Sequence, residues 1–297
     1  MTRLSLLLVA ALAASARAQT IQPIESLWLT SPRLIGRPLS MTDGLKEWRP
    51  VFDAIILVKL PPTFVGDADF TLQAQTLLKE VGGSFVLATL PVGTEGWETS
   101  ANQRLAERQS RQFEPAKAVP QPQWLETLED IDSGTWAWIL EQPARMPAPD
   151  QAARSAAEFV RFAKSRHKKA AIWLSAEAFG HHQFKELTRR ICESTKDADY
   201  YGWMDLETES IRSGEANWLG SLSDLLDQIL AVSPKEKTII QFANNPKWPA
   251  KDVAGTIAYI SACQAKGINR FCLMSGPPML DRDPWRDFYR NLPRVRR

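Results

Sequence analysis

Short runs of apolar residues alternate along the chain with longer amphipathic segments. The runs are rich in Val, Ile, Phe and Trp and lie at 26–30, 52–60, 83–93, 135–143, 169–178, 199–207, 237–246 and 269–278. Because nearly continuous apolar runs are typical of strands buried on both faces, they predict a parallel sheet. Between the runs, apolar residues recur at steps of three and four, as in helices that rest on a sheet. These segments span 69–81, 151–165, 182–193, 218–232 and 251–266.

Eight strands that are each followed by a helix or a long connection predict a (β/α)8 barrel of the TIM type, a single domain from residue 19 to 297. The first run is the weakest of the eight, so a seven- or eight-stranded variant or an open doubly wound sheet is the alternative. A polar stretch with scattered prolines, 96–132, breaks the alternation after the third strand. We expect a long insertion there, on the face where such barrels keep their active sites, with a simple polar helix and linker as the alternative.

The first eighteen residues, 1–18, predict an export signal. Arg3 precedes an apolar run from Leu4 to Ala14, and Ala16-Arg17-Ala18 fits the small-residue rule for cleavage before Gln19. This run is too short to span a bilayer, which takes about 20 residues. We therefore expect a secreted or periplasmic protein with no membrane partner.

Charge and cysteine content narrow the classes of partner and chemistry. The chain has 36 Lys and Arg against 34 Asp and Glu, which predicts no nucleic-acid surface, and we expect a monomer. Of the three cysteines, Cys192, Cys263 and Cys272, an exported protein can pair two, but a chain of this length does not require a disulfide. The sequence has no phosphate-binding Gly-rich loop, G-x-S-x-G elbow or H-E-x-x-H motif, which argues against nucleotide and serine-hydrolase chemistry.

Four acids follow the ends of three successive predicted strands. Glu141 ends the fourth strand, Glu177 the fifth, and Asp205 and Glu207 the sixth. Active sites of such barrels lie at the C-terminal ends of the strands, so these carboxylates are the candidate catalytic groups. The alternative for Glu141 and Glu177 is an ordinary salt bridge at a strand end.

Alternation along the sixth strand gives a direction to its side chains. Helices pack best on apolar residues, so we expect Met204 and Leu206 to face the helices, which sends Trp203, Asp205 and Glu207 inward. The two carboxylates would then lie about 6–7 Å apart along the strand. Two close carboxylates raise the pKa of at least one of them, which a general acid requires. The alternative is an ion-paired layer inside the barrel.

The strand end Trp203-Met204-Asp205-Leu206-Glu207 resembles the Asp-x-Glu strand end of barrel-type muramidases and, more loosely, of chitinase-like glycoside hydrolases. The resemblance implies that Glu207 is the proton donor and Asp205 the acid that orients it, with Glu141 or Glu177 as the opposing carboxylate. Those families carry the motif on the fourth strand and not the sixth. Tyr201 and Trp203 also stand where the longer chitinase motif has two further Asp residues. The function expected is that of an exported glycoside-hydrolase-like enzyme acting on a polysaccharide or other glycan.

Aromatic and amide side chains near the strand ends fit a carbohydrate substrate. Trp offers a flat face on which a sugar ring can stack, and amides hydrogen-bond to hydroxyl groups. The expected substrate-binding residues are Trp97, Trp203, Gln241, Asn244, Asn245, Trp248 and Trp285. Trp138 and Trp173 are candidates for the core, and Asn-Asn-Pro at 244–246 is also a good turn.

Two other functions fit the same residues. Glu141, Glu177 and Asp205 end three successive strands, and such oxygen ligands suit Mg²⁺ or Ca²⁺ in a metal-dependent barrel enzyme. A non-catalytic carbohydrate-binding barrel would keep the aromatic residues without competent acids. The carboxylate mechanism itself requires no metal and no cofactor.

Overall fold

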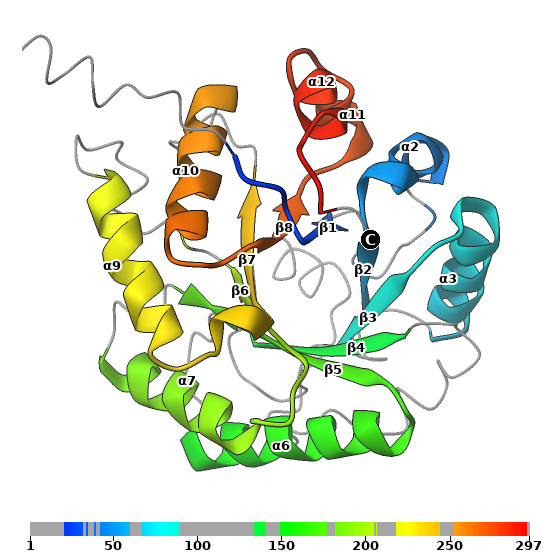
Figure 1. The fold of residues 1–297 in the computed structure, drawn as a ribbon. Coiled ribbons are helices and arrows are strands. Elements are labelled where there is room, and N and C mark those ends of the chain that lie inside the picture. The colour runs from blue at the N-terminus through cyan, green and yellow to red at the C-terminus, as the bar shows by residue number, and fades with distance from the viewer. Residues whose placement is uncertain are drawn as a thin grey trace, which may run out of the picture.

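The computed structural model describes residues 21–31, 34, 39, 42–59, 67–89, 134–140, 149–176, 182–204, 206, 218–243 and 252–295. Eight parallel strands pair in chain order and close into a barrel, β1 to β8 and back to β1 (Figure 1). The strands are β1 (Ser26–Thr30), β2 (Ala54–Lys59), β3 (Phe85–Thr89), β4 (Thr135–Leu140), β5 (Lys169–Ser175), β6 (Tyr200–Met204), β7 (Thr238–Ala243) and β8 (Arg270–Met274). The predicted (β/α)8 barrel is confirmed, including its weak first strand. The predicted insertion at 96–132 lies outside the described residues.

Helices surround the barrel, and those that the periodicity predicts are present. They are α3 (Asp67–Val81), α6 (Pro149–Ser165), α7 (His182–Ser194), α9 (Trp218–Leu230) and α10 (Val253–Ala265). Shorter helical pieces that the sequence analysis did not predict are α2 (Thr42–Trp48), η3 (Arg49–Val51), η5 (Lys235–Lys237), α11 (Pro277–Leu280) and α12 (Trp285–Arg290). In the part of the chain that the structure describes, no helix has the length and apolar character needed to cross a membrane.

The strands separate two apolar layers, because successive side chains of a strand point to opposite faces. One layer joins the outer face of the strands to the helices, and Trp136 and Trp138 belong to it. The other layer contains strand residues and fills the barrel. Its buried members are Trp28, Ala54, Ile56, Val58, Val86, Ala88, Ala137, Ile139, Ala171, Trp173, Met204, Ile239 and Cys272.

Two tryptophans occupy the centre of the barrel interior. The rings of Trp28 and Trp173 stack with centroids 5.9 Å apart, and the ring of Tyr200 meets Trp28 edge-on at 5.2 Å. Gly202 lies opposite Trp173 in the strand register. A Cβ atom at position 202 would lie 2.1 Å from Cδ2 of Trp173. The barrel can therefore hold both indoles only because Gly202 and several alanines leave them room.

The direction predicted for the side chains of β6 is wrong. Met204 packs in the barrel interior, whereas Tyr201 and Trp203 lie in the layer that faces the helices. The physical reason is the space that the Trp173 ring takes inside the barrel. A Cβ atom at position 202 would collide with that ring, so Gly202 lies on the inward face, and Met204, two residues later, lies on the same face. On the outer side, Tyr201 Oη donates to the carbonyl of Thr195 at 2.6 Å, and Trp203 Nε1 donates to Ser233 Oγ at 3.2 Å.

Two aspartates tie together the N-terminal ends of the strands. Oδ2 of Asp53 accepts a hydrogen bond from the backbone N–H of Leu27 at 2.8 Å and forms an ion pair with Arg294. Oδ2 of Asp199 accepts the N–H of Ala170 at 2.7 Å in the same way. Because Arg294 lies in the C-terminal segment, its pair with Asp53 fixes that segment to the barrel. These acids are structural and lie at the end opposite the predicted site.

All three cysteines are free and buried. Burial raises the pKa of Cys192 to about 12 and raises the pKa of Cys263 and Cys272 well above the ordinary value for a thiol. They are packed thiols, which agrees with the expectation that a chain of this length does not require a disulfide.

Candidate functional site

The mouth of the barrel, where the strands end, carries uncharged side chains at its described inward-facing positions. They continue the alternation of the interior layer, and each lies at or near the C-terminal end of its strand. The set consists of Thr30, Val58, Ala88, Ile139, Ser175, Met204, Gln241, Ala243 and Met274. The floor of the mouth is therefore mostly apolar, with a few neutral hydrogen-bonding groups.

Ser175 and Gln241 are the polar residues of this floor with the least satisfied hydrogen-bonding groups. Among the described residues, Ser175 Oγ is buried and has no hydrogen-bond partner. Gln241 Nε2 donates to the Sδ of Met274 at 3.8 Å, and a thioether is a weak acceptor. Gln241 lies near the end of β7, and its alternation with Ile239 places it on the inward face. Its contact with a substrate stays a prediction.

Two of the predicted substrate-binding tryptophans are buried. Trp203 is fully buried in the helix-facing layer. Trp285 lies in α12 and is 7% exposed. Its ring stacks on Tyr289 with centroids 5.8 Å apart and meets Phe288 edge-on. The inward direction predicted for Trp203 is wrong, because its ring packs between the strands and the helices. The substrate contact of Trp285 stays a prediction.

The remaining predicted site residues lie outside the described residues. They are the catalytic candidates Glu141, Glu177, Asp205 and Glu207, and the substrate-binding candidates Trp97, Asn244, Asn245 and Trp248. Their roles stay predictions. The described part of the chain contains no group of three or more His, Cys, Asp or Glu residues that could hold a metal ion. The three candidate Mg²⁺ or Ca²⁺ ligands do not fall within that part.

The strand phase changes the support for the four acids. Ile139 and Ser175 are inward-facing positions of β4 and β5, and Glu141 and Glu177 follow each of them by two residues in the sequence. The same count from Met204 in β6 reaches Leu206, which instead packs in the helix-facing layer. Leu206 faces the helices as predicted, so a count from Leu206 still directs Asp205 and Glu207 inward, whereas a count from Met204 directs them outward. The phase of β6 therefore gives these two acids no single direction. At β4 and β5 the count is consistent, because Leu140 and Ala176 face the helices and an acid follows each of them.

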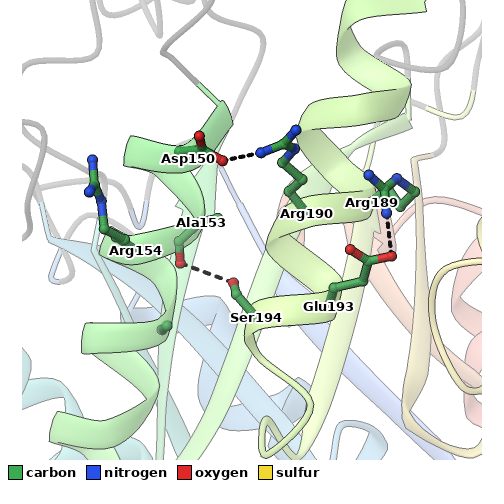
Figure 2. Close-up of a pocket in the computed structure, with 8 residues that line it drawn as sticks. Asp150, Ala153, Arg154, Arg189, Arg190, Glu193 and Ser194 are labelled. Carbon is green, nitrogen blue, oxygen red and sulfur yellow. Dashed lines mark hydrogen bonds and ion pairs between the residues drawn. The ribbon is translucent and has the colours of Figure 1, made fainter.

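A shallow pocket of about 570 Å³ lies on the outside of the barrel, between α6 and α7. Figure 2 shows Arg190 reaching across from α7 to Asp150 on α6, and Ser194 bonding to the backbone carbonyl of Ala153 at 3.0 Å. Arg189 pairs with Glu193 at 2.5 Å. Two of its three arginines, Arg189 and Arg190, already pair with carboxylates, so among the described residues the pocket is mainly a charged contact between two helices.

Glu186 on α7 makes part of this contact sensitive to acid. Hydrogen bonds from Arg189 and then Arg190 lower the pKa of Glu186 from 4.5 to about 2. A lowered folded-state pKa stabilises the protein above about pH 4.5, and this contribution is lost as the pH falls towards 2. The carboxylate is exposed to solvent, so the contribution is small.

Replacing Glu186 by Gln is expected to lower the melting temperature slightly at neutral pH, with a difference from wild type that shrinks between pH 5 and pH 2. Thermal unfolding followed by circular dichroism across this range measures it. High salt at neutral pH should also reduce the difference, because exposed pairs are screened. A difference that is constant with pH and salt would show that the lost contact is steric rather than electrostatic.

Comparison with solved structures finds the same fold in proteins of distant sequence. The spore cortex-lytic enzyme SleL of Bacillus cereus is 10% identical over 93% of this chain and 76% of its own, with a TM-score of 0.57. A GH18 chitinase from Pseudoalteromonas aurantia is 10% identical over 90% and 98%, with a TM-score of 0.56. The glycoside hydrolase domain of PgaB (BpsB) from Bordetella bronchiseptica is 10% identical over 93% and 100%, with a TM-score of 0.55.

The sequence itself adds no closer relationship. No protein-family model matches the chain, and no curated protein matches its sequence. At 10% identity the likeness to solved structures shows the fold alone, since a (β/α)8 barrel supports many unrelated activities. The chain has the (β/α)8 barrel fold, which a solved GH18 chitinase and a solved glycoside hydrolase domain share.

Proposed function

We propose that the protein is an exported barrel enzyme that acts on a glycan, a glycoside hydrolase that uses side-chain carboxylates as general acid and base. The observation that carries the proposal is the inward phase of β4 and β5 at their C-terminal ends. Ile139 and Ser175 face inward, and an acid follows each of them two residues later in the sequence, Glu141 and Glu177. Two neighbouring strands, each followed by a carboxylate, suit a reaction that requires two carboxylates.

The described floor of the mouth supports a neutral, hydroxyl-rich ligand. Ser175 and Gln241 offer hydrogen-bonding groups without charge, and the positions around them are apolar. Substrate pockets typically combine an apolar surface with a few placed polar groups. Glycoside hydrolases among the solved structures of this fold give the proposal a precedent, and the predicted signal sequence fits an extracellular or periplasmic glycan.

In the proposed reaction one carboxylic acid protonates the glycosidic oxygen as its bond to the sugar breaks. The other carboxylate attacks the sugar directly or activates the water that does so. Glu141 and Glu177 have the stronger support for these two roles. Asp205 and Glu207, which directly follow β6 in the sequence, are further candidates, with Glu207 as the proton donor that the resemblance implies.

The test is release of reducing ends from a panel of chitin, peptidoglycan, β-glucan and deacetylated or acetylated glucosamine polymers. We expect wild type to cleave at least one of them and EDTA to leave the rate unchanged, because the mechanism uses carboxylates alone. Activity that EDTA abolishes and Mg²⁺ or Ca²⁺ restores would favour the metal-dependent alternative. Binding without cleavage would favour a carbohydrate-binding barrel, and a wild type that neither binds nor cleaves any polymer would overturn the proposal.

A further inference from the structure

Ser175 is buried at the end of β5 with a hydroxyl group that makes no hydrogen bond to the part of the chain that the structure describes. The residue is 4% exposed, and Oγ has no partner among the described residues. Alternation along β5 gives its direction, because Ala171 and Trp173 face the barrel interior while Ile172 and Leu174 face the helices. The unpaired hydroxyl therefore points into the barrel at its mouth.

Gln241 lies at the same level of the mouth as Ser175, with one strand between them. Ser175 is opposite Met204 in the register of β5 and β6. Trp203 is opposite Ile240 in the register of β6 and β7, which places Gln241 beside Met204 one residue further. The backbones of β5 and β7 are then about 10 Å apart, since neighbouring strands are separated by about 4.8 Å. Two inward-facing polar side chains thus flank the thioether of Met204.

Burial of an unpaired hydroxyl disfavours the folded protein, because the same group is hydrogen-bonded to water in the unfolded chain. The hydrogen bond from Gln241 Nε2 to the Met274 thioether is also weak, because a thioether is a poor acceptor. A ligand that brings a hydroxyl group to this floor would satisfy both side chains. Ser175 can donate or accept, and the Gln241 amide can do both, so a group that itself donates and accepts suits them.

We propose that Ser175 and Gln241 form a binding subsite for a neutral saccharide hydroxyl at the floor of the barrel mouth. Ser175 is then a specificity-determining residue, kept at a cost to the stability of the free protein. This inference rests on the proposed function, and it names the part of the substrate that reaches deepest into the site. It assigns no role in proton transfer to either residue.

Ser175→Ala is expected to separate stability from binding. Removing the unpaired hydroxyl should raise the melting temperature of the free protein by about 2–4 °C. The same change should weaken binding of a soluble oligosaccharide roughly 3- to 10-fold, the effect of one neutral hydrogen bond. Gln241→Leu, which keeps the approximate size of the side chain, should also weaken binding. The probes are chitotetraose, cellotetraose and laminaritetraose, and isothermal titration calorimetry measures the affinity.

Ser155→Ala is the matched control. Ser155 is a second buried serine whose Oγ has no partner among the described residues, but it lies on α6 outside the barrel. Its replacement should stabilise the free protein in the same way and leave the affinity unchanged. If wild type and Ser175→Ala bind an oligosaccharide with the same affinity, the subsite is overturned and the proposed function still stands. If wild type binds none of these oligosaccharides, the subsite fails, and the polymer panel decides the proposed function separately.

Discussion

Gly202→Ala is expected to destabilise the barrel severely, by about 3 kcal/mol or more of the free energy of unfolding. The added Cβ would lie 2.1 Å from Cδ2, 2.2 Å from Cε3 and 2.5 Å from Cε2 of Trp173, three atoms of a rigid ring. That ring cannot move away easily because it stacks on Trp28 inside a closed barrel. Overpacking of a core usually costs about 1–3 kcal/mol, and this site has little room to relax. Urea unfolding followed by fluorescence measures the loss.

A control and a rescue separate this clash from the general effect of replacing a glycine. A Cβ at Gly134, which precedes β4, would meet nothing within 4 Å, so Gly134→Ala should change the stability little. Trp173→Leu should itself destabilise the protein by leaving a cavity. In that background, however, Gly202→Ala should cost much less than in wild type. Equal costs in the two backgrounds would show that the two residues are not coupled through this contact.

The sequence predicted the order and number of strands well because each strand is a separate apolar run with helices or long connections on either side. The direction of each side chain was harder to predict, because both faces of a barrel strand are buried and apolar. In β6, Met204 competed with Tyr201 and Trp203 for the helix-facing side, whereas Leu206, just after the strand, lies on that side as predicted. Aromatic residues took that side because Tyr201 and Trp203 find hydrogen-bond acceptors after α7 and α9.

A signal for the correct phase was nevertheless present in the sequence. A glycine inside a strand often marks a close approach by a large neighbour, and Gly202 is such a residue. Small residues recur in the same way at the inward positions of other strands, as Ala88 in β3, Ala137 in β4 and Ala171 in β5. Reading these small residues as the interior face would have sent Met204 inward. It would also have put Glu141 and Glu177 ahead of Asp205 and Glu207.

The short helices after β8 escaped prediction for a different reason. α11 begins with two prolines, and α12 has only six residues and follows Pro284, so neither shows a helical period of useful length. Isolated helices of this size are not stable. Packing of Trp285 and Tyr289 against the helix-facing layer stabilises α12 instead. A tryptophan next to a proline therefore lies in a short helix that the sequence pattern does not reveal.

Glu141→Gln and Glu177→Gln are each expected to lower kcat/KM on the glycan substrate by about 10²–10⁴-fold, the usual contribution of a general acid or base. Glutamine keeps the shape of the side chain, so the melting temperature should stay close to that of wild type. Glu158→Gln, on the exposed face of α6, is the matched control and should retain full activity. Initial rates of reducing-end release measure all three variants.

The nature of the leaving group can assign the two roles. An activated aryl glycoside leaves without a proton, so a variant that has lost the general acid should recover most of its rate on such a substrate, whereas a variant that has lost the nucleophile or base should not. We expect one of the variants Glu141→Gln and Glu177→Gln to recover most of its rate on the aryl glycoside and the other to stay slow. If both variants stay active while Glu207→Gln or Asp205→Asn is inactive, the catalytic pair belongs to the residues after β6. The inward phase of β4 and β5 would then be a feature of the barrel core without a catalytic consequence.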